Sequence, residues 1–108
     1  MQPMASYSVD ISQEVRHDIR RLPGNLRQRV WRTLRSLEVD PRPPRSKALD
    51  LERASLDVPP DMELRRLRIR SWRMIYVIEE EANRVSVIAL RKRPPYQYED
   101  LTALMADR

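Results

Sequence analysis

The sequence predicts an α+β domain in which a helical hairpin packs on a mainly antiparallel sheet, with elements in the order β-α-α-β-β-β. Three observations predict this fold: a short alternating segment near the start, two segments with apolar residues at helical spacing, and three strand-like runs late in the chain. The 108 residues are enough for one modest core, so we expect a single domain over residues 1–108.

The first predicted elements are a strand and a helix. Apolar and polar residues alternate over Tyr7–Ile11, which is typical of a short, half-buried strand. Ser12 is a suitable N-cap for a helix that continues through Leu22. Apolar residues at i, i+4 and i+7 would form one stripe along this helix and pack it on the sheet.

A second helix is predicted after the interruption at Pro23-Gly24. Asn25 is the candidate N-cap, and apolar residues repeat down one side of the helix until Asp40-Pro41 stops it. Residues 40–61 are rich in proline and charge, and they predict a loop with room for one short extended piece.

Three further strands complete the predicted sheet, approximately over Glu63–Arg70, Trp72–Glu79 and Arg84–Leu90. Because only short turn segments separate them, we expect antiparallel hairpins. The acidic run over residues 79–81 is expected to be a solvated turn, and Asp100–Met105 is expected to form a short terminal helix.

Basic residues gather on these last predicted strands. The chain has 21 Lys and Arg residues against 16 Asp and Glu, a net charge of +5, and lysine occurs only at positions 47 and 92. The basic residues in question are Arg66, Arg68, Arg70 and Arg73, followed by Arg91-Lys92-Arg93. The first three have strand spacing, so they would share one side of the strand while Leu67 and Ile69 face the other. Guanidinium groups on one side of a sheet suit a phosphate-rich ligand, and RNA is the leading candidate.

The composition excludes several classes of function. The absence of cysteine rules out disulfides, thiol catalysis and cysteine-based zinc sites, and a single histidine leaves too few ligands for a transition-metal site. We therefore expect no metal and no cofactor. No run approaches the roughly 18 apolar residues of a membrane span. The first residues lack the basic flank and apolar segment of a secretory signal, so we expect a cytoplasmic protein.

Two segments resemble the RelE/ParE superfamily of bacterial toxins from type II toxin–antitoxin pairs. Residues 67–78, with the sequence LRIRSWRMIYVI, are similar to the two central strands of that family, which join a basic strand to an aromatic-Arg-aliphatic-aliphatic-Tyr opening. Residues 87–93, followed by Tyr96 and Tyr98, are similar to its last strand, which ends in a basic triplet with a tyrosine shortly after. The resemblance spans about Tyr7 to Leu101.

The resemblance implies a function. RelE-like members are ribosome-dependent endoribonucleases that cut mRNA and inhibit translation, without a metal and with the RNA 2′-hydroxyl as nucleophile. Expected partners are then a cognate antitoxin, the ribosome and mRNA, with no membrane and no small-molecule cofactor. ParE-like members share the fold, lack nuclease activity and poison DNA gyrase. A third alternative is an inactive relative that only binds an antitoxin.

The resemblance also implies residue roles. Arg73 and Arg93 match arginines assigned to phosphate and transition-state contacts, and Tyr98 matches the C-terminal tyrosine that stacks on a base or orients the nucleophile. These three are the catalytic candidates. The candidates for RNA and phosphate binding are Arg66, Arg68, Arg70, Arg91, Lys92 and Tyr96. The alternatives are a solvated sheet face without a ligand or, for Arg73 and Arg93, internal ion pairs.

One departure from the family pattern bears on the chemistry. Arg66 and Arg68 match positions where the best-known RelE-like toxins carry lysines, and arginine stays protonated, so neither can serve as a general base. Lys92 would point to the opposite side of its strand from Arg91, and His17 is expected to be a surface residue of the first helix. The proton acceptor, the codon preference, the antitoxin and the oligomeric state stay open.

Overall fold

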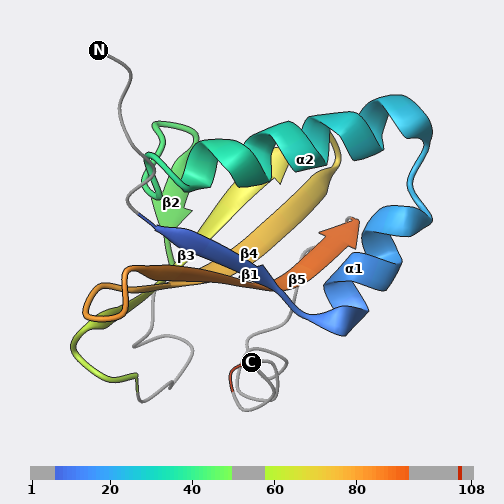
Figure 1. The fold of residues 1–108 in the computed structure, drawn as a ribbon. Coiled ribbons are helices and arrows are strands. Elements are labelled where there is room, and N and C mark those ends of the chain that lie inside the picture. The colour runs from blue at the N-terminus through green and yellow to red at the C-terminus, as the bar shows by residue number, and fades with distance from the viewer. Residues whose placement is uncertain (1–6, 50–57, 93–104, 106–108) are drawn as a thin grey trace.

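The computed structural model describes residues 7–49, 58–92 and 105 and confirms the predicted α+β class. Within this part of the chain, one sheet carries two helices on the same face (Figure 1). Its strands lie in the order β1-β5-β4-β3-β2. The strands are β1 (Ser8–Ile11), β2 (Ser46–Ala48), β3 (Met62–Ile69), β4 (Trp72–Glu79) and β5 (Arg84–Lys92). Only the β1–β5 pair is parallel, and β2 is the extended piece within the predicted loop.

The first helix, α1 (Gln13–Arg20), starts as expected, because Ser12 Oγ accepts a hydrogen bond from the backbone N–H of Val15 at 3.1 Å. The second helix, α2 (Gly24–Leu37), has no side-chain cap. The carbonyl of Pro23 accepts the first helical hydrogen bond, from the N–H of Arg27 at 2.8 Å. The prediction of Asn25 as N-cap was therefore wrong: proline, with φ at −54°, is preset for the start of a helix, so the first turn begins before Asn25.

The central strand β4 is buried on both faces. Met74, Ile75, Tyr76, Val77 and Ile78 are all 0% exposed. The odd and even members of this run belong to two separate clusters, one under the helices and one on the opposite side, which we call the second face. Met74 and Tyr76 are core residues of the helix-side cluster, and Trp72 is partly buried against them.

A β-bulge in β5 changes which side its last residues face. Ile75 pairs with Ala89 whereas Tyr76 pairs with Val87, so Ile88 is an extra residue without a direct partner. Val87 and Leu90 consequently both pack under the helices, although they are three residues apart. Ile88 and Ala89 both pack on the second face, where Met62 and Met105 also contribute.

The acidic run at the end of β4 differs from its prediction. Glu79 is only 3% exposed, and its Oε2 accepts hydrogen bonds from Arg84 Nε at 3.1 Å and Nη2 at 2.7 Å. The interpretation as a solvated turn was wrong for this residue, because Glu79 pairs directly with Arg84 across β4 and β5 and the ion pair replaces its water. Glu80 and Glu81 are exposed, as expected.

Neither helix in the described ranges combines the length and the apolar character that crossing a membrane requires. The terminal helix predicted over Asp100–Met105 lies outside the described residues except for Met105, which is helical.

We predict that Tyr76→Phe lowers the free energy of unfolding by about 1–3 kcal/mol. The Tyr76 hydroxyl, fully buried, donates to the carbonyl of Pro41 at 2.7 Å, and its removal leaves a buried acceptor unsatisfied. Tyr7→Phe is the matched control, because the Tyr7 hydroxyl donates to Glu80 at an exposed position. Urea unfolding followed by circular dichroism measures both, and a Tyr76→Phe midpoint no lower than that of Tyr7→Phe would contradict the assignment.

Candidate functional site

Three arginines lie side by side across the second face. The register pairs Arg68 of β3 with Arg73 of β4, and Arg73 with Arg91 of β5. Paired residues of neighbouring strands project to the same side, and the strands are roughly 4.8 Å apart. Their strand neighbours Met74 and Leu90 pack under the helices, so the arginines project from the second face. We call Arg68, Arg73 and Arg91 the arginine row.

The bulge in β5 is what completes this row. Without the extra residue, the alternation that buries Val85 and Val87 under the helices would carry Arg91 to that side as well. With the bulge, Arg91 faces the second side and Lys92, paired with Trp72, faces the helices. The structure thus places Lys92 opposite Arg91, as predicted, and keeps it out of the row.

The row concentrates positive charge, because three arginines stand side by side on adjacent strands. Like charges directly opposite each other on a sheet are destabilising, by about 1 kcal/mol at 4 Å even in water. The salt bridges within the described part of the chain involve Arg42, Arg65 and Arg84, and neither Arg68 nor Arg91 takes part in one. A bound anion with several oxygens would offset this repulsion.

Arg65 shows what a structural arginine looks like in the same strand. Its Nε donates to Ser46 Oγ at 2.9 Å, its Nη1 to Glu63 Oε2 at 2.9 Å, and its Nη2 to the Ser46 carbonyl at 3.2 Å. The side chain is only 14% exposed. Arg65 is therefore held by its neighbours, whereas Arg66 and Arg68, on the other side of β3, form no ion pair with any described acidic residue.

The ion pairs collect at the opposite end of β3. Arg42 joins Glu63, at 2.8 Å, to Glu80, and the hydroxyl of Tyr7 also donates to Glu80 at 3.0 Å. The hydrogen bond to Glu80 is the largest cause that raises the pKa of the Arg42 guanidinium. The hydrogen bonds from Arg42 and then Tyr7 hold the pKa of the Glu80 carboxyl below its usual value. Glu63 and Glu80 are thus held by Arg42 at the end of β3 that lies far from Arg68.

A second basic feature lies where β3 extends beyond β2. A cavity of about 420 Å³ opens there, and every residue that lines it is a cation. These residues are Arg29, Arg45, Lys47, Arg66, Arg68 and Arg70. We call this cavity the edge cleft. Arg68 belongs to both features, so the edge cleft and the arginine row are continuous.

The structure brings together part of the predicted site. Arg66, Arg68 and Arg70 line one cavity while Leu67 and Ile69 are 0% exposed in the helix-side core, which is the arrangement that the strand spacing predicts. Arg73 and Arg91 align with Arg68. Arg93, Tyr96 and Tyr98 lie outside the described residues.

Sequence reasoning did not find the cations that Arg29, Arg45 and Lys47 contribute to the edge cleft. Arg29 is on the exposed side of α2, and the arginine spacing in this helix indicates a polar face but not its neighbours. The position of Lys47 in the cleft follows from the pairing of β2 with β3, in which Lys47 lies opposite Arg66. The sequence would have predicted it only if that pairing had been known.

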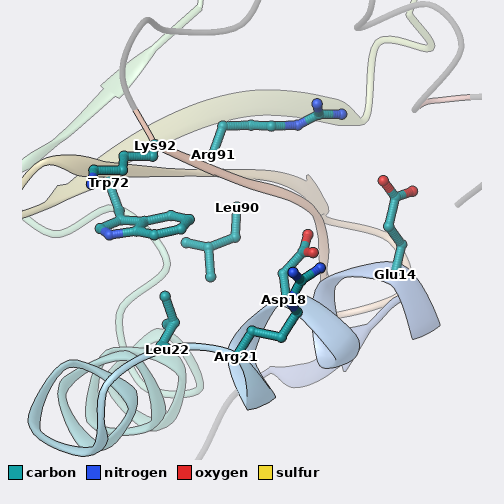
Figure 2. A pocket seen from close by; sticks show the side chains of 8 residues that line it. All are labelled: Glu14, Asp18, Arg21, Leu22, Trp72, Leu90, Arg91 and Lys92. Atoms are coloured by element: carbon teal, nitrogen blue, oxygen red, sulfur yellow. The ribbon is translucent and has the colours of Figure 1, made fainter.

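A second cavity, of about 450 Å³, lies between α1 and the end of β5 (Figure 2). Leu22, Leu90 and Trp72 point toward one another and form its apolar floor, while Glu14 and Asp18 rise from α1. Both signs of charge border it, since Arg21, Arg91 and Lys92 also line it. A mixed rim around an apolar floor suits a protein segment better than a polyanion.

The three arginines of the row can bind and stabilise negative charge. They offer no proton acceptor, because arginine as a residue type stays protonated. The one histidine, His17, is exposed on α1, in the helix layer on the other side of the sheet. In the described ranges, no three His, Asp or Glu side chains are grouped so that they could hold a metal ion. The arrangement therefore suits electrostatic stabilisation of a phosphate.

The protein is thus a small α+β domain with a helix pair on one face of its sheet and an arginine-rich second face. Residues 9–94 match the family described as "ParE toxin of type II toxin-antitoxin system, parDE". The chain belongs to this family, within the RelE/ParE superfamily that the sequence resembles.

Solved structures share the fold. The archaeal RelE–RelB complex from Pyrococcus horikoshii OT3 is similar at 22% identity and a TM-score of 0.71, over 84% of this chain and 99% of that one. The RelBE2 toxin–antitoxin complex from Mycobacterium tuberculosis is similar at 20% identity and a TM-score of 0.62, over 88% and 100%. The isolated E. coli RelE toxin gives 20% identity and a TM-score of 0.59, over 93% and 98%. No curated protein sequence matches the chain.

Arg70 generates a prediction about stability. Its φ of 55° lies in the left-handed region, which favours glycine and costs other residues roughly 1 kcal/mol. Arg70→Gly should raise the melting temperature by a few degrees, because it removes this strain and one cation from the edge cleft. The same substitution should weaken heparin binding.

Asn83→Gly is the control for this prediction, at a comparable φ of 49° that asparagine already tolerates. Differential scanning calorimetry compares the two variants. A melting temperature of Arg70→Gly below that of the unsubstituted protein would refute the strain at this turn.

Proposed function

We propose that this toxin binds RNA through the arginine row and cleaves messenger RNA on the ribosome, in the cytoplasm. The observation that carries the proposal is the alignment of Arg68, Arg73 and Arg91 on three adjacent strands, without an acidic partner for Arg68 or Arg91 in the described ranges. The similarity to solved RelE toxins supports the choice of RNA over other polyanions.

In the proposed reaction the 2′-hydroxyl of one nucleotide attacks the adjacent phosphorus. The 2′-hydroxyl gives up its proton to a general base as the P–O2′ bond forms. The P–O5′ bond breaks and the departing 5′ oxygen takes up a proton from a general acid or water, which leaves a 2′,3′-cyclic phosphate and a 5′-hydroxyl. Charge builds on the phosphate oxygens in the transition state, where a guanidinium can donate two hydrogen bonds. One such donor contributes on the order of 3 kcal/mol, by analogy with oxyanion holes.

Arg93 and Tyr98 stay part of this proposal as sequence-based predictions. Arg93 would add a further cation at the end of β5, and Tyr98 or Tyr96 would stack on a base or orient the nucleophile. The proton acceptor is not among the described residues of the row, so we expect it from the tyrosines, from the RNA or from the ribosome.

We further propose that a cognate antitoxin neutralises the toxin. The P. horikoshii and M. tuberculosis relatives were solved as complexes with their antitoxins. The cavity between α1 and β5 offers an apolar floor for a protein segment, and an acidic continuation could reach Arg91 at its border. An antitoxin seated there would compete with RNA for one end of the arginine row.

A second candidate is a gyrase inhibitor without chemistry of its own. Two observations favour it. The family description names parDE, and the row consists of arginines, which do not accept a proton. In this case the basic second face would contact an acidic protein surface or DNA.

We predict that induced expression arrests growth and produces new mRNA 5′ ends within coding regions. Arg73→Ala and Arg91→Ala should each lower the cleavage rate about 100-fold, because each removes one donor from the developing charge. Mapping of cellular 5′ ends measures this, and circular dichroism of the purified variants verifies that they fold.

Arg16→Ala is the matched control, since Arg16 is an exposed arginine of α1 that lines none of the cavities described above. Growth arrest with intact messages would overturn the nuclease proposal. If a supercoiling assay then shows inhibited gyrase, the second candidate holds instead.

A further inference from the structure

The edge cleft is lined by cations alone. Its lining contains no acidic, amide or aromatic side chain, and its six cations are suited to bind phosphate oxygens. Arg29, Arg45, Lys47, Arg68 and Arg70 are exposed, and Arg66 is partly buried. None of them forms a salt bridge within the described part of the chain.

The local structure keeps this cleft open. β2 pairs only with Arg65, Arg66 and Leu67, so in the described ranges the outer edge of β3 has no strand beside it from Arg68 onward. Arg70 holds a backbone conformation that favours glycine, and its side chain lines the cleft. A charged residue kept at a strained position is the kind of outlier from which a functional role can be inferred.

The positive surface continues beyond the cleft over α2. A smaller cavity, of about 240 Å³, shares Arg29 and Arg45 with the edge cleft and adds Arg32. Its remaining lining residues, Thr33 and Ser36, carry hydroxyls that are bonded to backbone carbonyls of their own helix. Cations thus follow one another from the arginine row, across the edge of β3, to the outer surface of α2.

We propose that this surface is a track for the phosphate backbone of single-stranded RNA that runs on from the arginine row. The inference rests on the proposed function for the row and extends it: the row holds the reacting phosphate, and the edge cleft holds phosphates several nucleotides away, independently of sequence. Arg68 joins the two, because it takes part in the register of the row and lines the cleft.

The length of the RNA distinguishes a track from a single site. Oligouridines of about 4 and about 12 nucleotides, both 2′-O-methylated so that they cannot be cleaved, cover the range of single-strand site sizes. The double variant Arg29→Ala/Arg45→Ala should bind the 12-mer several-fold more weakly than the unsubstituted toxin and the 4-mer equally well. The slope of log K against log salt for the 12-mer should become less steep by about 1.4, because each lost phosphate contact to a single strand contributes about 0.7.

The control is Arg16→Ala/Arg27→Ala, which removes the same charge from exposed helix positions. Neither arginine lines the edge cleft or the smaller cavity next to it. Equal 12-mer affinity and slope for the two double variants would overturn the track. So would a loss of 4-mer binding in the Arg29→Ala/Arg45→Ala variant, which would place both arginines at the row. Binding of a polyglutamate peptide, but not of the 12-mer, to the cleft would assign it to an acidic protein.

These outcomes are separate from those of the proposed function. New mRNA 5′ ends in cells together with equal binding by the two double variants would retain the nuclease and remove the track. Length-dependent binding without new 5′ ends would retain an RNA track on a protein that does not cut messages.

Discussion

The hydrogen-bond register of β3, β4 and β5 is the constraint on which the rest of the structure depends. It is fixed by the apolar run of β4, whose residues 74–78 are fully buried and alternate between two cores. Because the side-chain period of a strand is two, a slip by one residue would bury Arg73 under the helices and expose Met74. The same register that buries the core therefore aligns the arginines, and neither can change without the other.

Charge is divided along the sheet in a way that separates stability from binding. At one end, Glu63, Glu79 and Glu80 engage Arg42, Arg65 and Arg84. At the other end, arginines face one another and the described ranges offer no salt-bridge partner for Arg68 or Arg91. The pairs of Arg42 with Glu63 and Glu80 are exposed and add little to stability. One effect of this division is that Arg68 and Arg91 form no salt bridge within the described ranges.

The sequence was sufficient for the fold class and for the side that Arg66, Arg68 and Arg70 share, because strand alternation and helical periodicity are local properties. It was not sufficient for the row. Arg91 lies beside Arg73 only because of the bulge at Ile88. This bulge follows from packing between strands, and no glycine or proline in β5 marks its position in the sequence. Local sequence patterns could not predict the edge cleft either, because Arg29 lines it only through the packing of α2 over the sheet.

The presence of arginine at every position of the row, and at all positions of the edge cleft except Lys47, determines how the surface can be controlled. A lysine can lose its charge when its pKa is depressed, whereas arginine as a residue type is effectively always protonated in proteins. Binding then responds to ionic strength and to competing ligands, and any pH dependence must come from groups outside the row. A surface whose charge cannot be removed by deprotonation needs a partner that covers it before it is silenced, which is consistent with a toxin from a toxin–antitoxin family.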